Sequence, residues 1–254
     1  MICAGVDVGS LTAKCVIVED GKVLAYSVAK VSPDLEKSAE RVFEEAVKKA
    51  GVEVEYVVAT GYGRKKVSFA DRTVTEITCH ALGAKHVFPN CRTVIDIGGQ
   101  DSKVIAVGDG VENFVMNDKC AAGTGRFLEV MASALGVSVE ELGELDAKAD
   151  SPVSISSTCT VFAESEVISH LARGEKVENI VAGVHNAIAS RIAAMAQRVG
   201  IKPDVVMSGG VAKNRGVRRA LQELLGVRIL VPQEPQIIGA LGAALIACRS
   251  SRKT

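Results

Sequence analysis

A short pattern that occurs twice most strongly limits the folds open to this chain. Each copy has an apolar strand-like run, an aspartate, a glycine turn and a second apolar run. The first copy is Gly5-Val6-Asp7-Val8-Gly9-Ser10, and the second is Val94-Ile95-Asp96-Ile97-Gly98-Gly99. A lysine follows at the same offset in both, Lys14 and Lys103. Two units of strand, Asp-x-Gly turn, strand, strand and helix predict an internal duplication with two similar lobes facing each other.

The remaining hydrophobic pattern predicts an α/β protein of short apolar strands and amphipathic helices. Apolar runs bounded by turns predict strands at 2–8, 13–19, 23–28, 54–60, 94–97, 103–105, 111–116, 204–207 and 227–231. Apolar positions three and four apart indicate helices at 33–50, 75–86, 139–148, 160–173, 177–199, 211–225 and 237–248. A further helix is expected to open at Cys120, and Ser138 with Glu141 is typical of a capping box.

Composition narrows the classes of partner and compartment. The 254 residues are 48% hydrophobic, enough for a sizeable core in one large or two small domains. Lys+Arg and Asp+Glu are equal at 30 each, so there is no electrostatic case for nucleic acid or an anionic membrane. No apolar run reaches the roughly 18 residues of a membrane span, and no signal peptide is evident. Seven cysteines without a disulfide-like framework fit a reducing cytoplasm.

The two glycine turns have the chemistry of phosphate-binding turns. Glycine lets backbone N–H groups approach an oxyanion closely, and Ser10 and Thr12 add hydroxyl donors. An aspartate ahead of each turn, Asp7 or Asp96, is suited to hold Mg²⁺ directly or through water. A third turn, Ser208-Gly209-Gly210, ends a strand where an adenosine could lie. One such turn alone would be an ordinary β-hairpin, and the P-loop and GxGxxG patterns are both absent.

Two cysteines share a context that the other five lack. Cys120 lies in the segment 117–130 and Cys159 in the segment 156–168, each after a polar turn and before a helical pattern. A helix start carries unpaired N–H groups and partial positive charge, which favour a bound anion. A cubane iron–sulfur cluster takes four thiolates, so a twofold dimer would have to supply the second pair. The spacing alone leaves open that both are small core hydrophobes. The four histidines are interpreted as packing or surface residues.

Together these motifs resemble a known family. The order of phosphate turn, second phosphate turn, adenosine turn and Gly-Ala-rich helix is similar to the acetate kinase, sugar kinase, heat-shock chaperone and actin superfamily. The segments 116–127 and 156–166 closely resemble the activators of 2-hydroxyacyl-CoA dehydratases, which are related to the ATPase subunits of benzoyl-CoA reductase. The resemblance also includes 60–64 and 94–101 and covers nearly the whole chain.

The resemblance implies the architecture. We expect two duplicated actin-like, ribonuclease H-like lobes with a nucleotide cleft between them. Residues 1–90 would form the first lobe, completed by the C-terminal helix 237–254. Residues 91–236 would form the second lobe, which carries the cysteine helices.

The resemblance also implies the site and its cofactors. Both copies of Cys120 and Cys159 in a homodimer would hold one 4Fe-4S cluster, and each subunit would bind ATP or ADP. Asp7 and Asp96 would serve Mg²⁺ and the attacking water, which Gln100 would orient. The residues expected around the nucleotide are Gly9, Ser10, Leu11, Thr12, Ala13, Lys14, Gly98, Gly99, Gln100, Gly209, Gly210 and Gln236.

The implied activity is ATP-driven electron transfer. The dimer, reduced by ferredoxin or flavodoxin, would pass one low-potential electron to a separate 2-hydroxyacyl-CoA dehydratase component. Three alternatives stay open: the ATPase subunit of a benzoyl-CoA reductase-type complex, a small-molecule kinase of the same superfamily, and a non-enzymatic ATP-gated scaffold that resembles actin-like proteins. The scaffold would not explain two matched cysteine motifs. The kinase would need a substrate pocket with a base in the first lobe, which the sequence does not reveal, and it would not explain two matched cysteine motifs.

Overall fold

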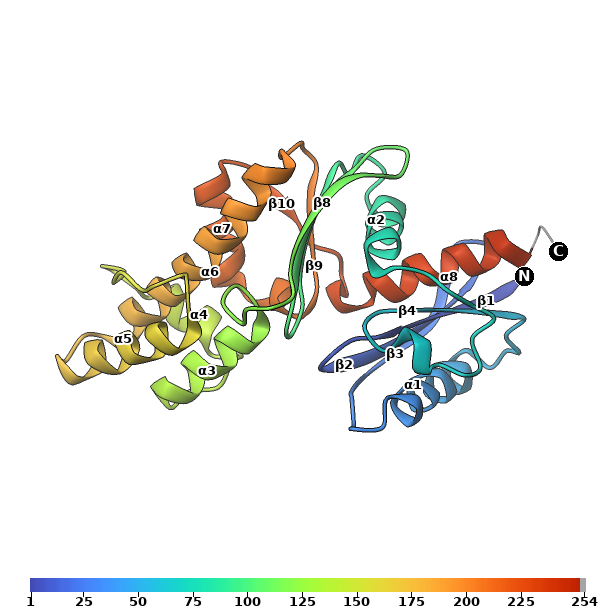
Figure 1. The fold of residues 1–254 in the computed structure, drawn as a ribbon, viewed down its shortest axis with the longest axis horizontal. Coiled ribbons are helices and arrows are strands. Elements are labelled where there is room, and N and C mark those ends of the chain that lie inside the picture. Colours follow the sequence, from blue (N-terminus) through green and yellow to red (C-terminus); the bar gives the residue numbers. More distant parts are fainter. Residues whose placement is uncertain (252–254) are drawn as a thin grey trace.

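The computed structural model describes residues 1–251 and contains two five-stranded mixed sheets, seen side by side in Figure 1. The first sheet has the order β3-β2-β1-β4-β5 and the second the order β10-β9-β6-β7-β8. The strands of the first sheet are β1 (Ile2–Val8), β2 (Thr12–Glu19), β3 (Lys22–Lys30), β4 (Tyr56–Thr60) and β5 (Arg72–Thr73). Those of the second sheet are β6 (Thr93–Ile97), β7 (Ser102–Val107), β8 (Val111–Asn117), β9 (Val205–Ser208) and β10 (Ile229–Leu230).

The two sheets repeat one topology down to the register of single residues. In each, two antiparallel hairpin strands lie on one side of the opening strand, and two parallel strands lie on the other. Asp7 pairs with Lys14 on one side and with Thr60 on the other. Asp96 is flanked in the same way by Lys103 and Ser208. The predicted duplication and two-lobed α/β fold are confirmed.

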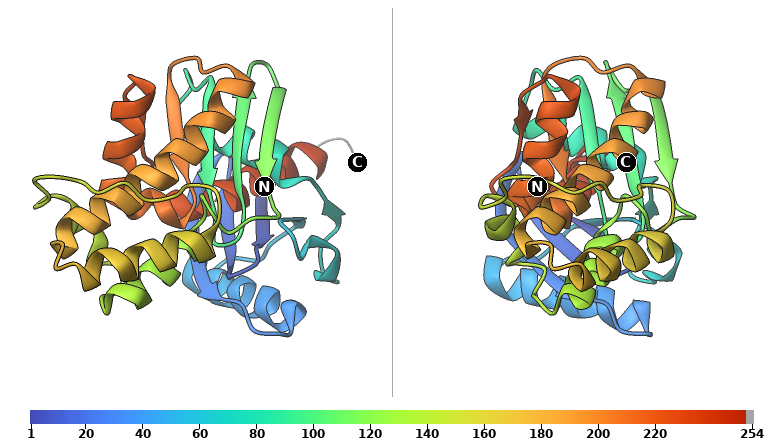
Figure 2. Two further views of the ribbon diagram at one scale, coloured as in Figure 1. Left: turned by 60° about the vertical axis from the view of Figure 1, so that its left-hand side comes forward. Right: turned by 90° about the vertical axis from the view of Figure 1, so that its left-hand side faces the viewer.

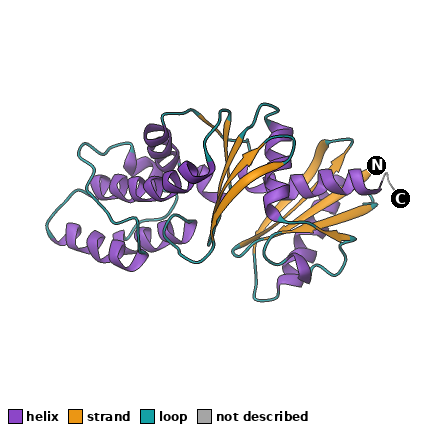
Figure 3. Ribbon diagram, turned by 45° about the horizontal axis from the view of Figure 1, so that its top comes forward, coloured by secondary structure: helices purple, strands orange, loops and turns teal. Residues whose placement is uncertain are grey.

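Helices cover both sheets, and most of them gather beyond the second sheet, as Figure 3 shows. Helix α1 packs on one face of the first sheet and α8 on the other. The second sheet shares its largest core with α3, α5, α6 and α7. The helices are α1 (Leu35–Ala50), α2 (Glu76–Val87), α3 (Gly125–Leu135), α4 (Leu142–Asp146), α5 (Thr160–Ala172), α6 (Val177–Val199), α7 (Arg215–Leu225) and α8 (Ile238–Ser251). Short 3-10 turns lie at Arg64–Lys66, Gly210–Lys213 and Pro235–Ile237.

Helices α2 and α8 connect the two sheets, because each comes after the last strand of one sheet and packs on the other sheet. Helix α2 lies early in the chain but packs its apolar face on the second sheet, whereas the C-terminal α8 packs on the first. The two helices cross at glycines: Gly83 lies against the Ile238 carbonyl, and Gly242 lies against the Cys79 carbonyl. A Cβ at either glycine would overlap that backbone, so glycine lets the helix axes approach closely.

Apart from the helix expected at Cys120, three predicted elements are clearly shorter in the structure than the sequence suggests. The helix expected at 139–148 shortens to α4, although the capping box is confirmed because Ser138 N–H and Oγ both donate to Glu141 Oε2. The helix expected at 211–225 is interrupted at Asn214, whose Oδ1 accepts from Gly216 N–H and caps α7. The strand expected at 227–231 reduces to β10, which pairs only with β9.

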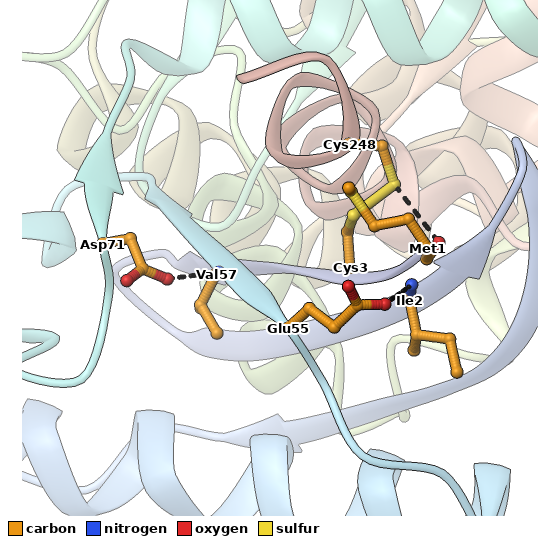
Figure 4. The surroundings of a disulfide bond; sticks show 7 residues. All are labelled: Met1, Ile2, Cys3, Glu55, Val57, Asp71 and Cys248. Carbon is orange, nitrogen blue, oxygen red and sulfur yellow. Dashed lines mark hydrogen bonds between the residues drawn. A yellow bond between two sulfur atoms is a disulfide. The ribbon is translucent and has the colours of Figure 1, made fainter. Parts of the chain in front are cut away.

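The expectation of a chain without disulfides is wrong at one pair. Cys3 on β1 and Cys248 on α8 are joined, as Figure 4 shows, with their Cα atoms 5.6 Å apart. That separation suits a disulfide, and it arises because the C-terminal helix packs along the N-terminal strand. A sequence separation of 245 residues gives no local signal for this pairing. No helix through residue 251 is long and apolar enough to cross a membrane.

Candidate active site

A cavity of about 1380 Å³ opens where the turns of the two sheets face each other, large enough for a nucleoside triphosphate. It is lined by most residues predicted around a nucleotide: Asp7, Gly9, Ser10, Leu11, Thr12, Lys14, Asp96, Gly98, Gly99, Gly209, Gly210 and Gln236. Ala13 is not among them because its side chain is fully buried in the sheet. Gln100 is also not among them, and its side chain is exposed to solvent.

The two phosphate turns have one construction and touch each other. Gly9 N–H donates to the Thr12 carbonyl at 3.0 Å, and Gly98 N–H donates to the Asp101 carbonyl at 2.9 Å. A Cβ at Gly99 would lie 2.6 Å from Leu11 Cγ, so glycine is required where the turns meet. Both turns therefore line the same cavity, and glycine turns of this kind are suited to bind a polyphosphate.

Each turn is preceded by a buried carboxylate with a lysine partner. Asp7 is 4% exposed, and Lys14 Nζ lies 3.3 Å from its Oδ2. Asp96 is 3% exposed, and Lys103 Nζ lies 3.3 Å from its Oδ2. Lys14 lines the cavity, so it is not merely a surface charge on its strand. Two carboxylates facing a phosphate cavity match the way Mg²⁺ is held, by one or two carboxylates together with substrate phosphates.

Asp96 is the more heavily supported carboxylate. Ser208 Oγ donates to its Oδ1 at 2.8 Å, and His80 Nδ1 lies 3.4 Å from the same oxygen. Burial by itself would raise the pKa of Asp96, but His80, Lys103 and the Ser208 hydrogen bond outweigh it and lower the pKa to about 2. The carboxylate is therefore ionised at neutral pH, as a magnesium ligand must be.

Lys103 is the charge centre of this region. Its ammonium lies 3.0 Å from Asp101 Oδ1, 3.3 Å from Asp96 Oδ2 and 3.3 Å from Glu76 Oε2. Burial of the amine favours the neutral form, yet the three carboxylates together raise the pKa of Lys103 well above its usual value. One buried cation therefore joins α2 to the second phosphate turn.

Sequence reasoning did not identify Glu76 or His80, although both line the cavity. They are four residues apart at the start of α2 and therefore share a helix face. The interpretation of His80 as a packing or surface residue is wrong, because its Nδ1 lies 3.2 Å from Ser208 Oγ beside Asp96. The i, i+4 spacing of two titratable residues was the available signal.

The far wall of the cavity is held by a second buried cluster. Asp146 of α4 accepts from Arg219 Nε at 2.8 Å and lies 2.9 Å from His185 Nδ1. Asn214 Nδ2 lies 3.1 Å from His185 Nε2, while Asn214 Oδ1 caps α7. These contacts require His185 to carry its proton on Nδ1, since Nε2 must accept. The cluster fixes α4, α6 and α7 around the cavity.

The two distinctive cysteines lie together, outside the residues that line the cavity. Cys120 Sγ is 3.7 Å from the carbonyl oxygen of Thr158, which directly precedes Cys159. Both cysteines are half-buried, whereas Cys15, Cys79 and Cys91 are buried. Burial raises the pKa of those thiols, to about 12 for Cys79 and about 11 for Cys91.

The expected start of a helix at Cys120 is wrong by five residues. Cys159 directly precedes α5 as predicted, but α3 begins only at Gly125. The Asn117 amide donates to the Cys120 and Ala122 carbonyls, and Gly123 has φ +86°, which breaks a helical path. Cys120 therefore sits on a loop fastened by side-chain hydrogen bonds.

Helix α3 is bonded directly to the second phosphate turn. Gly125 N–H donates to the Gly98 carbonyl at 2.8 Å, and Arg126 N–H donates to the Gly99 carbonyl at 2.7 Å. A Cβ at Gly125 would lie 3.2 Å from the Gly98 oxygen, so this junction is tight. The second phosphate turn is thus hydrogen-bonded to the first two residues of α3, which directly follow the Cys120 loop.

The duplicated sheets, paired carboxylates and facing glycine turns define an actin-like ATPase. At 16% identity and a TM-score of 0.61, a ROK family glucokinase from Streptomyces griseus shares this fold over 98% of the present chain and 100% of its own. Residues 4–247 match the BadF/BadG/BcrA/BcrD ATPase family, and the chain belongs to that family.

Two of the similar proteins are activators of 2-hydroxyacyl-CoA dehydratases. The (R)-2-hydroxyglutaryl-CoA dehydratase activating ATPase of Acidaminococcus fermentans is 52% identical, covering 98% of both chains. The solved activator of the 2-hydroxyisocaproyl-CoA dehydratase from Clostridium difficile, with bound ADPNP, is 46% identical with a TM-score of 0.94. That match covers 100% of this chain and 96% of the other.

Proposed function

We propose that this ATPase is the activator of a 2-hydroxyacyl-CoA dehydratase. Two copies would share one 4Fe-4S cluster and deliver single low-potential electrons to the dehydratase component, driven by ATP hydrolysis. The single observation that carries the proposal is the contact between the Cys120 thiol and the residue before Cys159, 38 positions apart in sequence. The named activators among the close relatives supply the substrate class.

The residues around the cavity fit a magnesium nucleotide. We assign Asp7 and Asp96 to Mg²⁺ and the glycine turns to the phosphates, with Ser10, Thr12 and Lys14 as side-chain donors. Leu11 closes the first turn against the second. Ala13 and Gln100 lie outside the cavity lining, so we propose no direct contact between either residue and the nucleotide. Gly209, Gly210 and Gln236 would lie along the adenosine. We take 1–90 together with 237–254 as one proposed lobe and 91–236 as the other, although α2 within the first range packs on the second sheet. Residues 252–254 of this assignment lie outside the described residues.

The two cysteines fit half of a cluster site. Among residues 1–251, no three His, Cys, Asp or Glu side chains are grouped to hold a metal ion. A cubane takes four thiolates, and two copies of Cys120 and Cys159 provide that number. A cluster bound there would supply the electron. The chain's own contribution is to hold the Cys120 loop through Asn117 and the Cys159 loop through Glu166, whose Oε2 accepts from Ser156 N–H at 2.6 Å.

The surface beside the cysteines fits a second copy of the chain. Val161 is 65% exposed, Phe162 64% and Ile168 53%, all on the helix that Cys159 opens. Covering such apolar side chains stabilises association by roughly 25 cal/mol for each Å² removed from water. A twofold axis here would also bring the two cysteine pairs together. The remaining parts of the proposal are a ferredoxin or flavodoxin electron donor and a cytoplasmic location.

Replacing single cysteines tests the proposal. Cys120→Ser and Cys159→Ser in anaerobically purified protein should each lose the cluster, because each removes two of its four ligands from the dimer. Cys79→Ser and Cys91→Ser, at buried sites away from the loops, serve as matched controls and should keep their iron. The measurements are iron and sulfide content and the visible spectrum. Full iron in Cys159→Ser would contradict the shared site.

A further inference from the structure

The nucleotide cavity contains a carboxylate that no part of the phosphate or magnesium assignment uses. Glu76 is the first residue of α2. Thr75 is the N-cap of this helix, and its Oγ1 accepts from Thr78 N–H. Its side chain is 21% exposed and lines the cavity with the two phosphate turns. It enters from α2, whereas Asp7 and Asp96 lie at the ends of strands.

Beside the two phosphate turns, the other acidic and amide groups are already engaged or face solvent. The remaining acidic residues of the lining, Glu129, Glu140, Glu144 and Asp146, lie on or next to α3 and α4 instead. Asp7 is paired with Lys14, and Asp96 accepts from Ser208 beside Lys103. Asp101 closes the second turn through its own carbonyl and keeps Lys103 within 3.0 Å. Gln100 is exposed, and an amide cannot accept a proton at neutral pH. Glu76 contacts Lys103 Nζ at 3.3 Å and is the carboxylate beside the turns to which the phosphate and magnesium assignments give no role.

We propose that Glu76 is the general base of ATP hydrolysis. A water oxygen bonds to the terminal phosphorus while the bond from that phosphorus to the bridging oxygen of the ADP leaving group breaks. The carboxylate of Glu76 accepts the proton released by that water. It later returns the proton to solvent as ADP and inorganic phosphate depart. No redox change is involved, so the inference concerns hydrolysis and is independent of the cluster.

The surroundings of Glu76 suit that role. Burial raises the pKa of Glu76 above its usual value, Lys103 opposes the rise, and the carboxylates of Asp101 and Asp7 add to it. The charged groups that face Glu76 are therefore Lys103 on β7, Asp101 in the second turn, Asp7 on β1 and His80 on its own helix. A base works best when its pKa approaches the working pH, and an upward shift moves a glutamate in that direction.

Lys103 has a matching role as a positioning residue. Its ammonium contacts Glu76, Asp96 and Asp101 together, so it fixes the distance between the base and the magnesium carboxylate. It also keeps three neighbouring carboxylates from repelling one another in a buried site.

The test compares Glu76→Gln with Glu36→Gln in the intact dimer. Glu36 also lies in the first turn of a helix, α1, but is absent from the cavity lining. Glu76→Gln should lower kcat for ATP hydrolysis about 10²–10⁴-fold, the usual contribution of a general base, while ADP affinity and iron content stay at wild-type values. Glu36→Gln should hydrolyse ATP normally.

The pH profile distinguishes a base from a structural residue. Wild-type kcat should fall as pH decreases, because a protonated Glu76 cannot accept a proton, and the acid limb should disappear in Glu76→Gln. Glu76→Asp should recover part of the rate. Glu76→Gln hydrolysis within twofold of wild type, or an unchanged acid limb with reduced ADP affinity, would overturn the proposal. Since iron content is measured in the same samples, loss of hydrolysis with full iron leaves the shared-cluster proposal standing.

Discussion

At the scale of single residues, the site is built from two equivalent Asp–Lys pairs placed by strand register. Asp7 with Lys14 and Asp96 with Lys103 occupy the same positions in the two sheets. The sequence predicts these pairs because an aspartate before a glycine turn is a local pattern. It does not predict Glu76 or His80, because helix spacing fixes a shared face and not what that face meets. The cavity lies between residues distant in sequence.

The buried cluster of Asp146, His185 and Arg219 gives a prediction about stability and pH. Burial alone would raise the pKa of Asp146, but hydrogen bonds from His185 and Arg219 hold it well below its usual range. A lowered folded-state pKa gives stability that is complete above the unfolded value near 3.9 and is lost as pH falls through the folded value.

Asp146→Ala should therefore lower the free energy of unfolding by about 3–5 kcal/mol at neutral pH, the cost of breaking a buried pair. The difference in the free energy of unfolding between the variant and the wild type should become smaller below about pH 4, where the stabilisation by Asp146 begins to be lost. Asp150→Ala, which removes an exposed pair with Lys176, is the control and should change stability little. Urea unfolding at several pH values provides the comparison. A gap that widens toward acid would contradict the assignment.

At the scale of elements, a helix forms where the sequence predicts it when local interactions alone determine its conformation. Helices α1 and α2 form where periodicity and caps agree, Asp34 and Thr75 supplying the N-caps. The alanines after Cys120 favour helix by propensity, but the Asn117 hydrogen bonds and the conformation of Gly123 hold that stretch as a loop. These local hydrogen bonds and the Gly123 backbone thus override the helical propensity of the alanines.

The crossing of α2 and α8 yields a prediction at this scale. Gly242→Ala would place a methyl group against the Cys79 carbonyl, which is backbone and cannot rotate away. We expect a loss of about 1–3 kcal/mol, the typical cost of overpacking, with the helices forced apart. Gly110→Ala is the matched control, because nothing lies within 4 Å of the added methyl group. Thermal unfolding would measure both, and equal melting temperatures would show that the crossing is not tight.

At the scale of the whole molecule, the duplicated topology could be predicted and the exchange of helices could not. The repeated sequence pattern predicts two sheets of the same topology, and Figure 2 shows these sheets from two further sides. The placement of α2 on the second sheet and α8 on the first depends on contacts far apart in sequence. This exchange makes the two helices the physical connection between the sheets that hold Asp7 and Asp96.

The proposed function requires that the nucleotide and the cysteine loops communicate. The connection is short: phosphates at Gly98 and Gly99 would touch the turn whose carbonyls accept from Gly125 and Arg126 of α3, directly after the Cys120 loop. A change in this turn on binding or hydrolysis must move α3 or break those hydrogen bonds. Coupling between two sites is reciprocal, so the nucleotide should alter the cysteine site and the cysteine site should alter nucleotide affinity.

The most direct test is the rate at which a chelator removes iron from the anaerobically purified protein, in which the proposed cluster would be the source of that iron. The rate would be measured without nucleotide, with ADP, and with a non-hydrolysable ATP analogue, at saturating concentrations. We expect different rates in these three states, because the second phosphate turn should hold the start of α3 differently in each. Identical rates in all three would mean that the nucleotide does not reach the cysteine loops, and the proposal of ATP-driven electron delivery would be contradicted.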